Sequence, residues 1–317
     1  MSHERLHNMK KNKDKKLKSV DLFCGCGGMS LGFQNAGFNV LSAFDNWEIA
    51  VQTYNSNFLH KSYQVDISDQ KFNELLEPFS PDLISGGPPC QDFSIAGKRN
   101  AKGSRANMTI IFSQIIAKVR PKWFVMENVY NIEKFPVLSQ ALKVFKGAGY
   151  GISKRVIDAS YVGVPQMRRR YFVIGRLGVE DGFLDEILLA GLSRQRMTVN
   201  DYLGDTLGTK YYYMHPRSYN RRAIFSVNEP SATIRGVNRP MPGNYKKHPA
   251  DKTADFNRVR PLSSAERAMI QTFPSSYIFK GSKSAVEQMI GNAVPVKLAE
   301  YVARAILKYE TSLNDRV

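Results

Sequence analysis

Residues 81–91 constrain the fold of this chain more strongly than any other stretch. Their first part, PDLIS, has the composition of a short buried strand, and the following GGPP ends that strand in a tight turn. The turn is followed at once by a thiol, Cys90. Because open α/β sheets bind their ligands beyond the carboxyl ends of the strands, this order predicts a sheet with Cys90 at its ligand-binding edge. A lone cysteine is more often an inert buried residue, so its surroundings must decide between the two interpretations.

The surroundings of Cys90 indicate an anionic substrate. Residues 92–105 are polar and glycine-rich, and they hold four cations against one acid. The chain of 317 residues has 45 Lys and Arg against 28 Asp and Glu, a formal net charge of +17, which favours a polyanionic partner. A membrane surface is the competing explanation. It is disfavoured because no apolar run reaches the ~18 residues of a spanning helix and no signal-peptide pattern is present.

The cysteine content indicates a reducing compartment. The chain has three cysteines, Cys24, Cys26 and Cys90, and an odd number in a long chain argues against a disulfide framework. We therefore expect a cytoplasmic protein. Cys24 and Cys26 have no further metal-binding residues beside them in the sequence, so no metal site is expected.

A glycine-rich turn follows the first predicted strand. Residues 18–23, KSVDLF, form that strand, and residues 24–28, CGCGG, lead into a helix. Such a turn lets a nucleotide-like ligand approach the backbone closely, although a purely structural turn accounts for it equally well. No GxxxxGK[ST] motif is present, which disfavours a nucleoside triphosphate.

Acids end the next two predicted strands. Asp45 follows the strand at 38–44, and Asp66 lies at the end of the strand around residues 64–67. An acid in this position can accept both hydroxyls of a ribose. Each acid alone is also typical of a helix cap or a turn, but the two acids after the glycine turn favour a nucleoside pocket.

Two further strands bring charged residues to the predicted site. The strand at 121–126 ends in Glu127, on the same sheet edge as Cys90. A carboxylate near a nucleophilic thiol is unfavourable unless it has a use, because it raises the pKa of that thiol. We expect that use to be binding of a ring nitrogen of a substrate base by Glu127. Three arginines precede the strand at 171–175, and they cannot all be buried. They are either a solvated charge run or an alternating arrangement in which Arg168 and Arg170 face the site.

Residues 176–258 interrupt the alternation of strands and helices. Within them, residues 210–247 contain eight Lys or Arg, one acid (Glu229) and five tyrosines. Basic residues interleaved with aromatic ones in an irregular segment favour contact with DNA over a merely solvated face. Arg235 and Arg239 are the preferred candidates for contacts with guanine, because arginine can bind its O6 and N7 together.

Taken in chain order, these motifs resemble those of the DNA (cytosine-5) methyltransferases of bacterial restriction–modification systems. The resemblance covers residues 19–308. It departs from the usual pattern at Cys24 and Cys26, where small or apolar residues are usual, and at Pro88, where an aromatic residue is common. The matching motifs are Asp21-Leu22-Phe23 with Gly25 and Gly27-Gly28; Pro88-Pro89-Cys90-Gln91; Glu127-Asn128-Val129; Gln166, Arg168 and Arg170; Arg260-Pro261-Leu262-Ser263 with Gln271-Thr272-Phe273-Pro274; and Gly291-Asn292-Ala293-Val294-Pro295.

The resemblance implies an α/β fold. It would consist of a Rossmann-like S-adenosylmethionine-dependent methyltransferase domain and a smaller, irregular, β-rich target-recognition domain. The expected division is a disordered basic arm at 1–18, a discontinuous catalytic domain at 19–175 and 285–317, and the target-recognition domain at 176–284. The DNA-reading part of that domain would lie at about 176–258.

The resemblance also implies the reaction. A methyl group would pass from S-adenosylmethionine to carbon 5 of a flipped-out cytosine in a specific short sequence of double-stranded DNA. Cys90 would add to carbon 6, Glu127 would hold N3 and the exocyclic amine, and Arg170 would hold O2 with support from Arg168. Positions that match cofactor contacts are Asp21, Phe23, Gly25, Gly28, Asp45, Asn46, Asp66, Ile67, Pro89, Asn292 and Val294.

The expected partner is duplex DNA, bound by a monomer in the bacterial cytoplasm in association with the nucleoid. Such an enzyme can be paired with a restriction endonuclease that acts on the same site without stable binding. Expected DNA contacts are Gln91, Ser94, Lys98, Arg99, Thr233, Arg235 and Arg239.

Two alternatives remain from the sequence. An RNA cytosine-5 methyltransferase would share the motifs, but the long basic region favours duplex DNA. A catalytically silent DNA-binding protein would keep residues 176–258 but has no need to combine Cys90, Glu127 and Arg170. An enzyme that methylates adenine or an exocyclic amine is disfavoured. Those enzymes use an Asp/Asn-Pro-Pro-aromatic turn, whereas this chain has Gly-Pro-Pro-Cys at residues 87–90.

Overall fold

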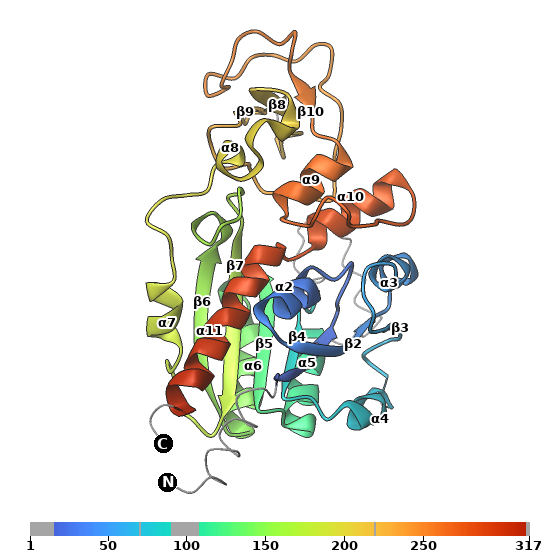
Figure 1. The fold of residues 1–317 in the computed structure, drawn as a ribbon, viewed down its shortest axis with the longest axis vertical. Helices are drawn as coiled ribbons and strands as arrows, with labels where there is room; N and C mark the ends of the chain where they lie inside the picture. The colour runs from blue at the N-terminus through green and yellow to red at the C-terminus, as the bar shows by residue number, and fades with distance from the viewer. Residues whose placement is uncertain (1–15, 70, 90–107, 219, 315–317) are drawn as a thin grey trace, which may run out of the picture.

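A seven-stranded sheet forms the centre of the molecule (Figure 1). The structure, a computed structural model, describes residues 16–69, 71–89, 108–218 and 220–314. The strand order is β3-β2-β1-β4-β5-β7-β6, and β7 alone runs in the direction opposite to the other six strands. The predicted α/β class is thereby confirmed. The strands are β1 (Lys18–Leu22), β2 (Asn39–Asp45), β3 (Ser62–Gln64), β4 (Leu83–Gly86), β5 (Trp123–Val129), β6 (Tyr150–Asp158) and β7 (Arg169–Leu177).

Helices cover both faces of this sheet, so its central strands β1, β4 and β5 are buried along most of their length. Neighbouring residues of β5 show this, because Val125 and Met126 are both fully buried but belong to the cores on opposite faces. One face packs against α2 (Gly28–Ala36), α7 (Asp185–Ala190) and α11 (Val296–Asn314). The other packs against α4 (Phe72–Leu76), α5 (Met108–Val119) and α6 (Pro136–Gly147), while α3 (Glu48–Asn55) lies beside β2 and β3.

The C-terminal helix returns to the first strands of the chain. The sequence predicts it at 294–309, whereas α11 begins at Val296 and continues to Asn314. It packs along α2 so closely that a Cβ atom on Gly32 would lie 2.5 Å from the carbonyl oxygen of Val296. The first and the last helix of the described chain therefore share one layer.

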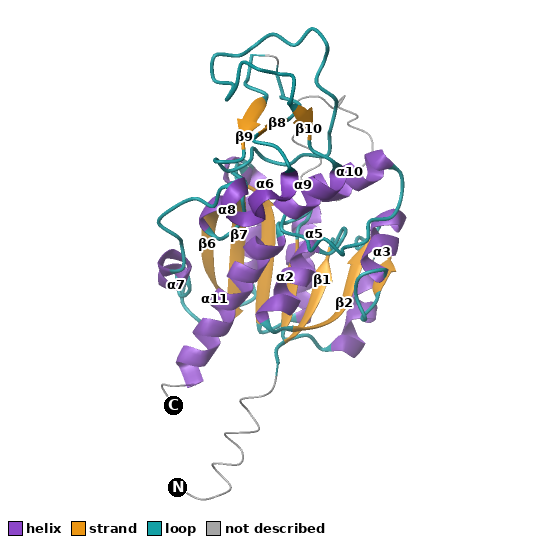
Figure 2. Ribbon diagram, turned by 45° about the horizontal axis from the view of Figure 1, so that its top comes forward, coloured by secondary structure: helices purple, strands orange, loops and turns teal. Residues whose placement is uncertain are grey.

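A second, smaller sheet lies beyond the carboxyl ends of the large one, with α9 and α10 between them (Figure 2). Its order is β10-β8-β9, and the long segments between these strands are irregular. The regular elements here are β8 (Tyr211–Tyr213), β9 (Ile224–Ser226), β10 (Arg260–Pro261), α8 (Val199–Leu203), α9 (Ser264–Ile270) and α10 (Lys283–Asn292). Single 3-10 turns are η1 (Glu77–Phe79), η3 (Ile132–Lys134), η4 (Ala159–Tyr161) and η5 (Gly204–Leu207).

Three elements of the structure, β1, α7 and α10, bear on the predicted division into domains. Strand β1 begins at Lys18, the last residue assigned to the basic arm, and residues 1–15 lie outside the described ranges. Helix α7 packs on α11 because Leu184 and Leu188 are fully buried there, although its residues fall in the range expected for target recognition. Helix α10 runs through the boundary expected at residue 285. The division itself stays a prediction.

Within the described ranges, no helix is long and apolar enough to cross a membrane.

Replacing Gly28 tests how tightly the start of α2 packs against the C-terminal segment. A Cβ atom there would lie 2.2 Å from the carbonyl oxygen of Val294, so Gly28→Ala must displace the backbone. We expect a loss of roughly 1–3 kcal/mol in the free energy of unfolding, measured with urea. The matched control is Gly147→Ala at the end of α6, where a Cβ atom would meet nothing within 4 Å. An equal loss in both variants would contradict the close packing at Gly28.

Candidate active site

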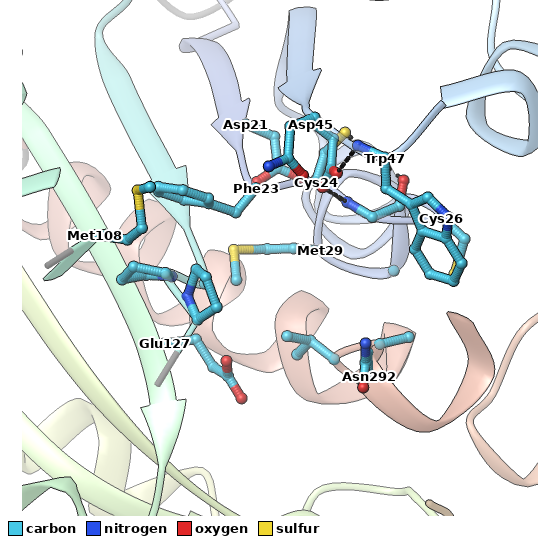
Figure 3. Close-up of a pocket in the computed structure, with 18 of the residues that line it drawn as sticks. Asp21, Phe23, Cys24, Cys26, Met29, Asp45, Trp47, Met108, Glu127 and Asn292 are labelled. Carbon is cyan, nitrogen blue, oxygen red and sulfur yellow. Dashed lines mark hydrogen bonds between the residues drawn. The ribbon is translucent and has the colours of Figure 1, made fainter. Parts of the chain in front are cut away.

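A cavity of about 1110 Å³ opens beyond the carboxyl ends of β1, β2, β4 and β5. Figure 3 shows Asp45 and Trp47 on one side of it, Glu127 and Asn292 on the other, and Phe23 and Met29 between. Its lining includes all eleven of the predicted cofactor positions and two of the predicted catalytic residues, Glu127 and Arg170. The other residues of the lining are Cys24, Cys26, Met29, Trp47, Val65, Ser68, Gly87, Pro88, Met108, Thr109, Asn128, Val129, Gln288, Met289, Gly291 and Ala293.

The turn after β1 shapes the wall of this cavity. Phe23 has a φ of 57°, which is uncommon for a residue with a side chain and costs free energy. Gly25 follows with a φ of 52°, a conformation that glycine adopts without strain. Figure 3 shows the Phe23 ring on the cavity side, next to Met108. The strained turn therefore exposes both an aromatic face and bare backbone to a ligand.

Asp45 holds the glycine turn in place. Its Oδ2 accepts a hydrogen bond of 2.8 Å from the backbone N–H of Gly25, and its Oδ1 accepts one of 2.8 Å from that of Trp47. Burial raises the pKa of Asp45, and these backbone hydrogen bonds oppose the rise. Each carboxylate oxygen keeps a second lone pair, so Asp45 can still accept hydrogen bonds from a ligand.

Asp66 lies exposed at the edge of the same cavity. Its Oδ1 accepts hydrogen bonds from the backbone N–H of Ser68 at 2.9 Å and from the Ser68 hydroxyl at 2.6 Å. These bonds lower the pKa of Asp66, so its carboxylate is ionised at neutral pH. The turn role that the sequence left open for this acid is real, and it leaves the other carboxylate oxygen for a ligand.

Glu127 and Arg170 form a buried ion pair at the other end of the cavity. The strands β5 and β7 are neighbours, and Arg170 Nε lies 2.8 Å from Glu127 Oε1. Burial raises the pKa of Glu127, while the positive charge of Arg170 opposes that rise. The turn before Cys90 is close, since a Cβ atom on Gly87 would lie 3.2 Å from Glu127 Oε2. Cys90 itself lies outside the described residues, immediately after Pro89 in the sequence.

Arg168 does not line the cavity, although it shares a strand face with Arg170 by alternation. Its side chain is fully buried and donates to three carbonyl oxygens: Ile234 at 2.8 Å, Gly291 at 2.9 Å and Ala293 at 2.9 Å. Of the predicted alternating pair, only Arg170 reaches the cavity. Arg168 instead joins β7 to two segments distant in the sequence, and a catalytic role for it stays a prediction.

Three of the predicted DNA contacts, Thr233, Arg235 and Arg239, are described by the structure, and none of them lines the cavity. The Thr233 hydroxyl donates to the carbonyl oxygen of Met167 at 2.7 Å, the Arg235 guanidinium donates to that of His215, and Arg239 is exposed. Thr233, Arg235 and His215 line a small hollow under the second sheet. Gln91, Ser94, Lys98 and Arg99 lie outside the described residues.

Trp47 is the lining residue that sequence analysis should have found. It lies two residues after the strand-end acid Asp45 and precedes the first residue of α3. An aromatic residue two positions after an acid at a strand end is a usable signal for a nucleoside pocket. For Met29, Met108 and Gln288 the sequence offers no such signal.

No group of His, Cys, Asp and Glu side chains that could hold a metal ion occurs in the part of the chain that the structure describes.

Asp21 lies at the bottom of the cavity, nearly inaccessible to solvent. It accepts hydrogen bonds from the hydroxyls of Ser30 at 2.6 Å and Ser85 at 3.0 Å. Burial raises the pKa of Asp21 from 3.8 to about 7, against the lowering effect of both hydroxyls. The folded state therefore binds the proton of Asp21 more tightly than the unfolded state does.

Asp21→Asn should make the stability less dependent on pH. Because the folded-state pKa of Asp21 is raised to about 7, its contribution to stability is lost as the pH rises from about 4 to about 7. Between about pH 5 and about pH 8, the unfolding free energy of the wild type should fall by roughly 2–3 kcal/mol more than that of Asp21→Asn. The exposed Glu180→Gln is the control. Parallel pH profiles for wild type and Asp21→Asn would refute the raised pKa.

Comparisons with known proteins agree with one another. Residues 17–308 match the family described as C-5 cytosine-specific DNA methylase. The chain is 53% identical over 296 residues to the Type II methyltransferase M.HindV of Haemophilus influenzae, covering 93% of this chain and 97% of the relative. It is 50% identical over 294 residues to the Type II methyltransferase M.HgiDI of Herpetosiphon aurantiacus, covering 92% and 95%.

Among solved structures, the S. pombe Dnmt2 methyltransferase is similar with a TM-score of 0.69, covering 93% of this chain and 99% of that one. The sequence identity is 18%, so this likeness concerns the fold alone. It agrees with the Rossmann-like methyltransferase fold expected from the sequence, with a large mixed sheet and a small irregular part.

Proposed function

The chain belongs to the C-5 cytosine-specific DNA methylase family, and from that membership we propose how its own residues methylate cytosine in DNA. One observation carries the proposal. A single cavity holds the glycine turn and Asp45 at one end and the buried Glu127–Arg170 pair at the other, beside the turn that precedes Cys90 (Figure 3). Its volume of about 1110 Å³ exceeds the ~300–1,000 Å³ of a usual small-molecule site, which leaves room for a cofactor and a base together.

The residues around the glycine turn fit S-adenosylmethionine. Gly25 and Gly28 leave the backbone open, and the Phe23 ring offers a stacking surface for adenine. We assign Asp45 to the ribose hydroxyls, Asp66 to the adenine amine and Asn292 to the methionine end, because each lines the cavity with a polar group. When bound, the cofactor supplies the methyl group.

In the proposed reaction Cys90 acts on the ring of the flipped cytosine. Its thiolate sulfur forms a bond to carbon 6, and the electron pair of the 5,6 double bond makes carbon 5 nucleophilic enough to take the methyl group. Water or hydroxide then removes the proton of carbon 5, the double bond forms again, and the sulfur leaves. Because a free thiol titrates near ~8.5, only a minor fraction of Cys90 is thiolate near neutrality without help.

Glu127 and Arg170 would bind the edge of the same ring. A Glu127 carboxyl whose pKa is raised by burial can share a proton with N3 and accept a hydrogen bond from the exocyclic amine. Arg170 would donate to O2 while its pairing with Glu127 keeps both side chains oriented. This ring edge is reachable only after the cytosine leaves the duplex, which costs about a few kcal/mol.

We further propose that the irregular part around the second sheet reads the DNA sequence. Thr233, Arg235 and Arg239 are the candidates among the described residues, with Arg235 already oriented by its bond to the His215 carbonyl. The relatives of this protein carry the name Type II methyltransferase. This name supports a role of the protein as the modification enzyme beside a restriction endonuclease that acts on the same site. We expect this protein to act as a monomer.

Duplex DNA with 5-fluorocytosine at the target position tests the covalent step. Fluorine replaces the proton that has to leave carbon 5, so the sulfur cannot be released and a protein–DNA adduct should accumulate in the presence of S-adenosylmethionine. Cys90→Ala should form no adduct on denaturing gels but should still bind the duplex. An adduct in Cys90→Ala would overturn the assignment of the nucleophile, and a duplex with ordinary cytosine is the control.

Glu127→Gln tests the role of the buried carboxyl. The amide keeps the shape but can neither carry the charge nor share a proton with N3, so turnover should fall by roughly two to three orders of magnitude. The affinity for S-adenosylhomocysteine should stay near that of the wild type. Glu74→Gln, an exposed acid on α4, serves as the control. Turnover of Glu127→Gln within a few-fold of that control would exclude the proposed role.

A further inference from the structure

An arginine and a tyrosine stack on each other at the rim of the cavity. The guanidinium carbon of Arg169 lies 4.3 Å from the centre of the Tyr130 ring. Both residues adjoin the lining, because Tyr130 follows Val129 and Arg169 precedes Arg170, and Val129 is paired with Arg170 across β5 and β7. Since side chains alternate along a strand, Arg169 lies on the opposite sheet face from Arg170. Neither Tyr130 nor Arg169 is among the residues that line the cavity, so the stack lies beside it.

The turn that leads to Cys90 is hydrogen-bonded to the end of β5, next to Tyr130 in the sequence. Asn128 lies in the last part of β5, two residues before Tyr130 in the sequence. Its side-chain N–H donates to the carbonyl oxygen of Pro88 at 3.1 Å. The stacked pair therefore adjoins the ends of the two strands that hold the turn before the nucleophile, through Asn128, and the ion pair that we assign to the base.

Nothing described neutralises the charge of Arg169. Its side chain is exposed, and no hydrogen bond or ion pair joins its guanidinium to another residue of the described ranges. The acid opposite it in the strand pair, Asp158, instead accepts from the Ser160 hydroxyl at 2.8 Å. The ring of Tyr130 contacts the face of the guanidinium, which leaves the N–H groups at its edge for another partner.

A second arginine–tyrosine stack shows the contrast. The Arg196 guanidinium carbon lies 5.2 Å from the centre of the Tyr161 ring. Its N–H groups, however, donate to the Tyr161 hydroxyl at 3.2 Å and to the Met167 sulfur at 3.7 Å, and it lies 3.9 Å from the Asp158 carboxylate. Arg196 is occupied within the protein, whereas Arg169 is oriented by an aromatic ring and left without an acid.

Base flipping determines which anion would meet Arg169. The nucleotide turns about its backbone, so its base enters the cavity while the phosphates on either side stay at the rim. We propose that Arg169, supported by Tyr130, binds a phosphate of the target strand next to the flipped cytosine. The inference rests on the proposed function. Such a contact fixes the position of the backbone and carries no sequence information.

Binding of DNA at several salt concentrations tests the contact. The probe is a duplex with the sequence that bisulfite sequencing shows the wild type to methylate, in the presence of S-adenosylhomocysteine. Arg169→Ala should weaken binding about three- to tenfold at low salt and lower the slope of log K against log salt by about 0.9, the value for one phosphate contact. Arg169→Lys should keep the slope but lose part of the affinity, because lysine lacks the planar guanidinium that stacks on the ring and binds a phosphate bidentately.

The matched control removes an exposed cation far from the cavity. Lys308→Ala, near the end of α11 and at the opposite end of the large sheet, should change neither affinity nor slope. If Arg169→Ala behaves like Lys308→Ala, the inference is wrong.

Neutral methylphosphonates identify the phosphate itself. Each phosphate flanking the target cytosine is replaced in turn. In the wild type, one replacement should weaken binding as much as Arg169→Ala does, and the same replacement should cause no further loss in Arg169→Ala. Equal losses from every methylphosphonate in both proteins would overturn the proposal. If the wild type methylates no DNA, the proposed function fails. If it methylates DNA but the losses from Arg169→Ala and from each methylphosphonate simply add, the Arg169 contact alone fails.

Discussion

The arrangement of this molecule depends on the buried guanidinium of Arg168. It donates to the carbonyl oxygens of Ile234, Gly291 and Ala293, which come from two segments that approach β7 from different parts of the chain. A buried charge is costly unless its hydrogen bonds are satisfied, so both segments must hold their positions. Two side-chain amides join the same segments. Gln166 accepts a hydrogen bond from the backbone N–H of Ile234 at 2.8 Å and donates one to Gln271 at 2.8 Å. Gln271 in turn donates to the carbonyl oxygen of Ile290 at 2.5 Å.

This network fixes the irregular part relative to the cavity. Helix α10 lines the cavity through Gln288 and Asn292, and a Cβ atom on its Gly291 would lie 2.1 Å from the backbone nitrogen of Gly236. On another side of α10, Glu287 forms a buried ion pair with Arg267, which also donates to the carbonyl oxygen of Arg235. Residues proposed to read DNA are thus held by the same helix that borders the proposed cofactor site. An enzyme that flips one base within a recognised sequence requires such a fixed distance between reading and chemistry.

Sequence patterns predicted those features that depend on local order. The glycine turn, Asp45 and Glu127 lie at the carboxyl ends of β1, β2 and β5, and Asp66 lies just past β3, which ends at Gln64 and not at the predicted residue 67. The carboxyl ends of parallel strands meet at one edge of a sheet, so the convergence of these residues on one cavity follows. The burial of Arg168 could not be predicted, because the carbonyls that surround it lie more than sixty residues away in the chain. A smaller β-rich part was expected, but its individual strands could not be located for a similar reason, since β8, β9 and β10 have only two or three residues each and β8 pairs with β10 over a long separation.

The product of the reaction tests the central claim most directly. Purified protein is incubated with S-adenosylmethionine and either plasmid DNA or transfer RNA, and the nucleosides of each digest are separated and identified by mass spectrometry. The account predicts 5-methyldeoxycytidine in the DNA digest, without N4-methyldeoxycytidine or N6-methyldeoxyadenosine, and no new methylated cytidine in the RNA digest. A methyl group on an exocyclic amine, or methylation of RNA but not of DNA, would contradict it.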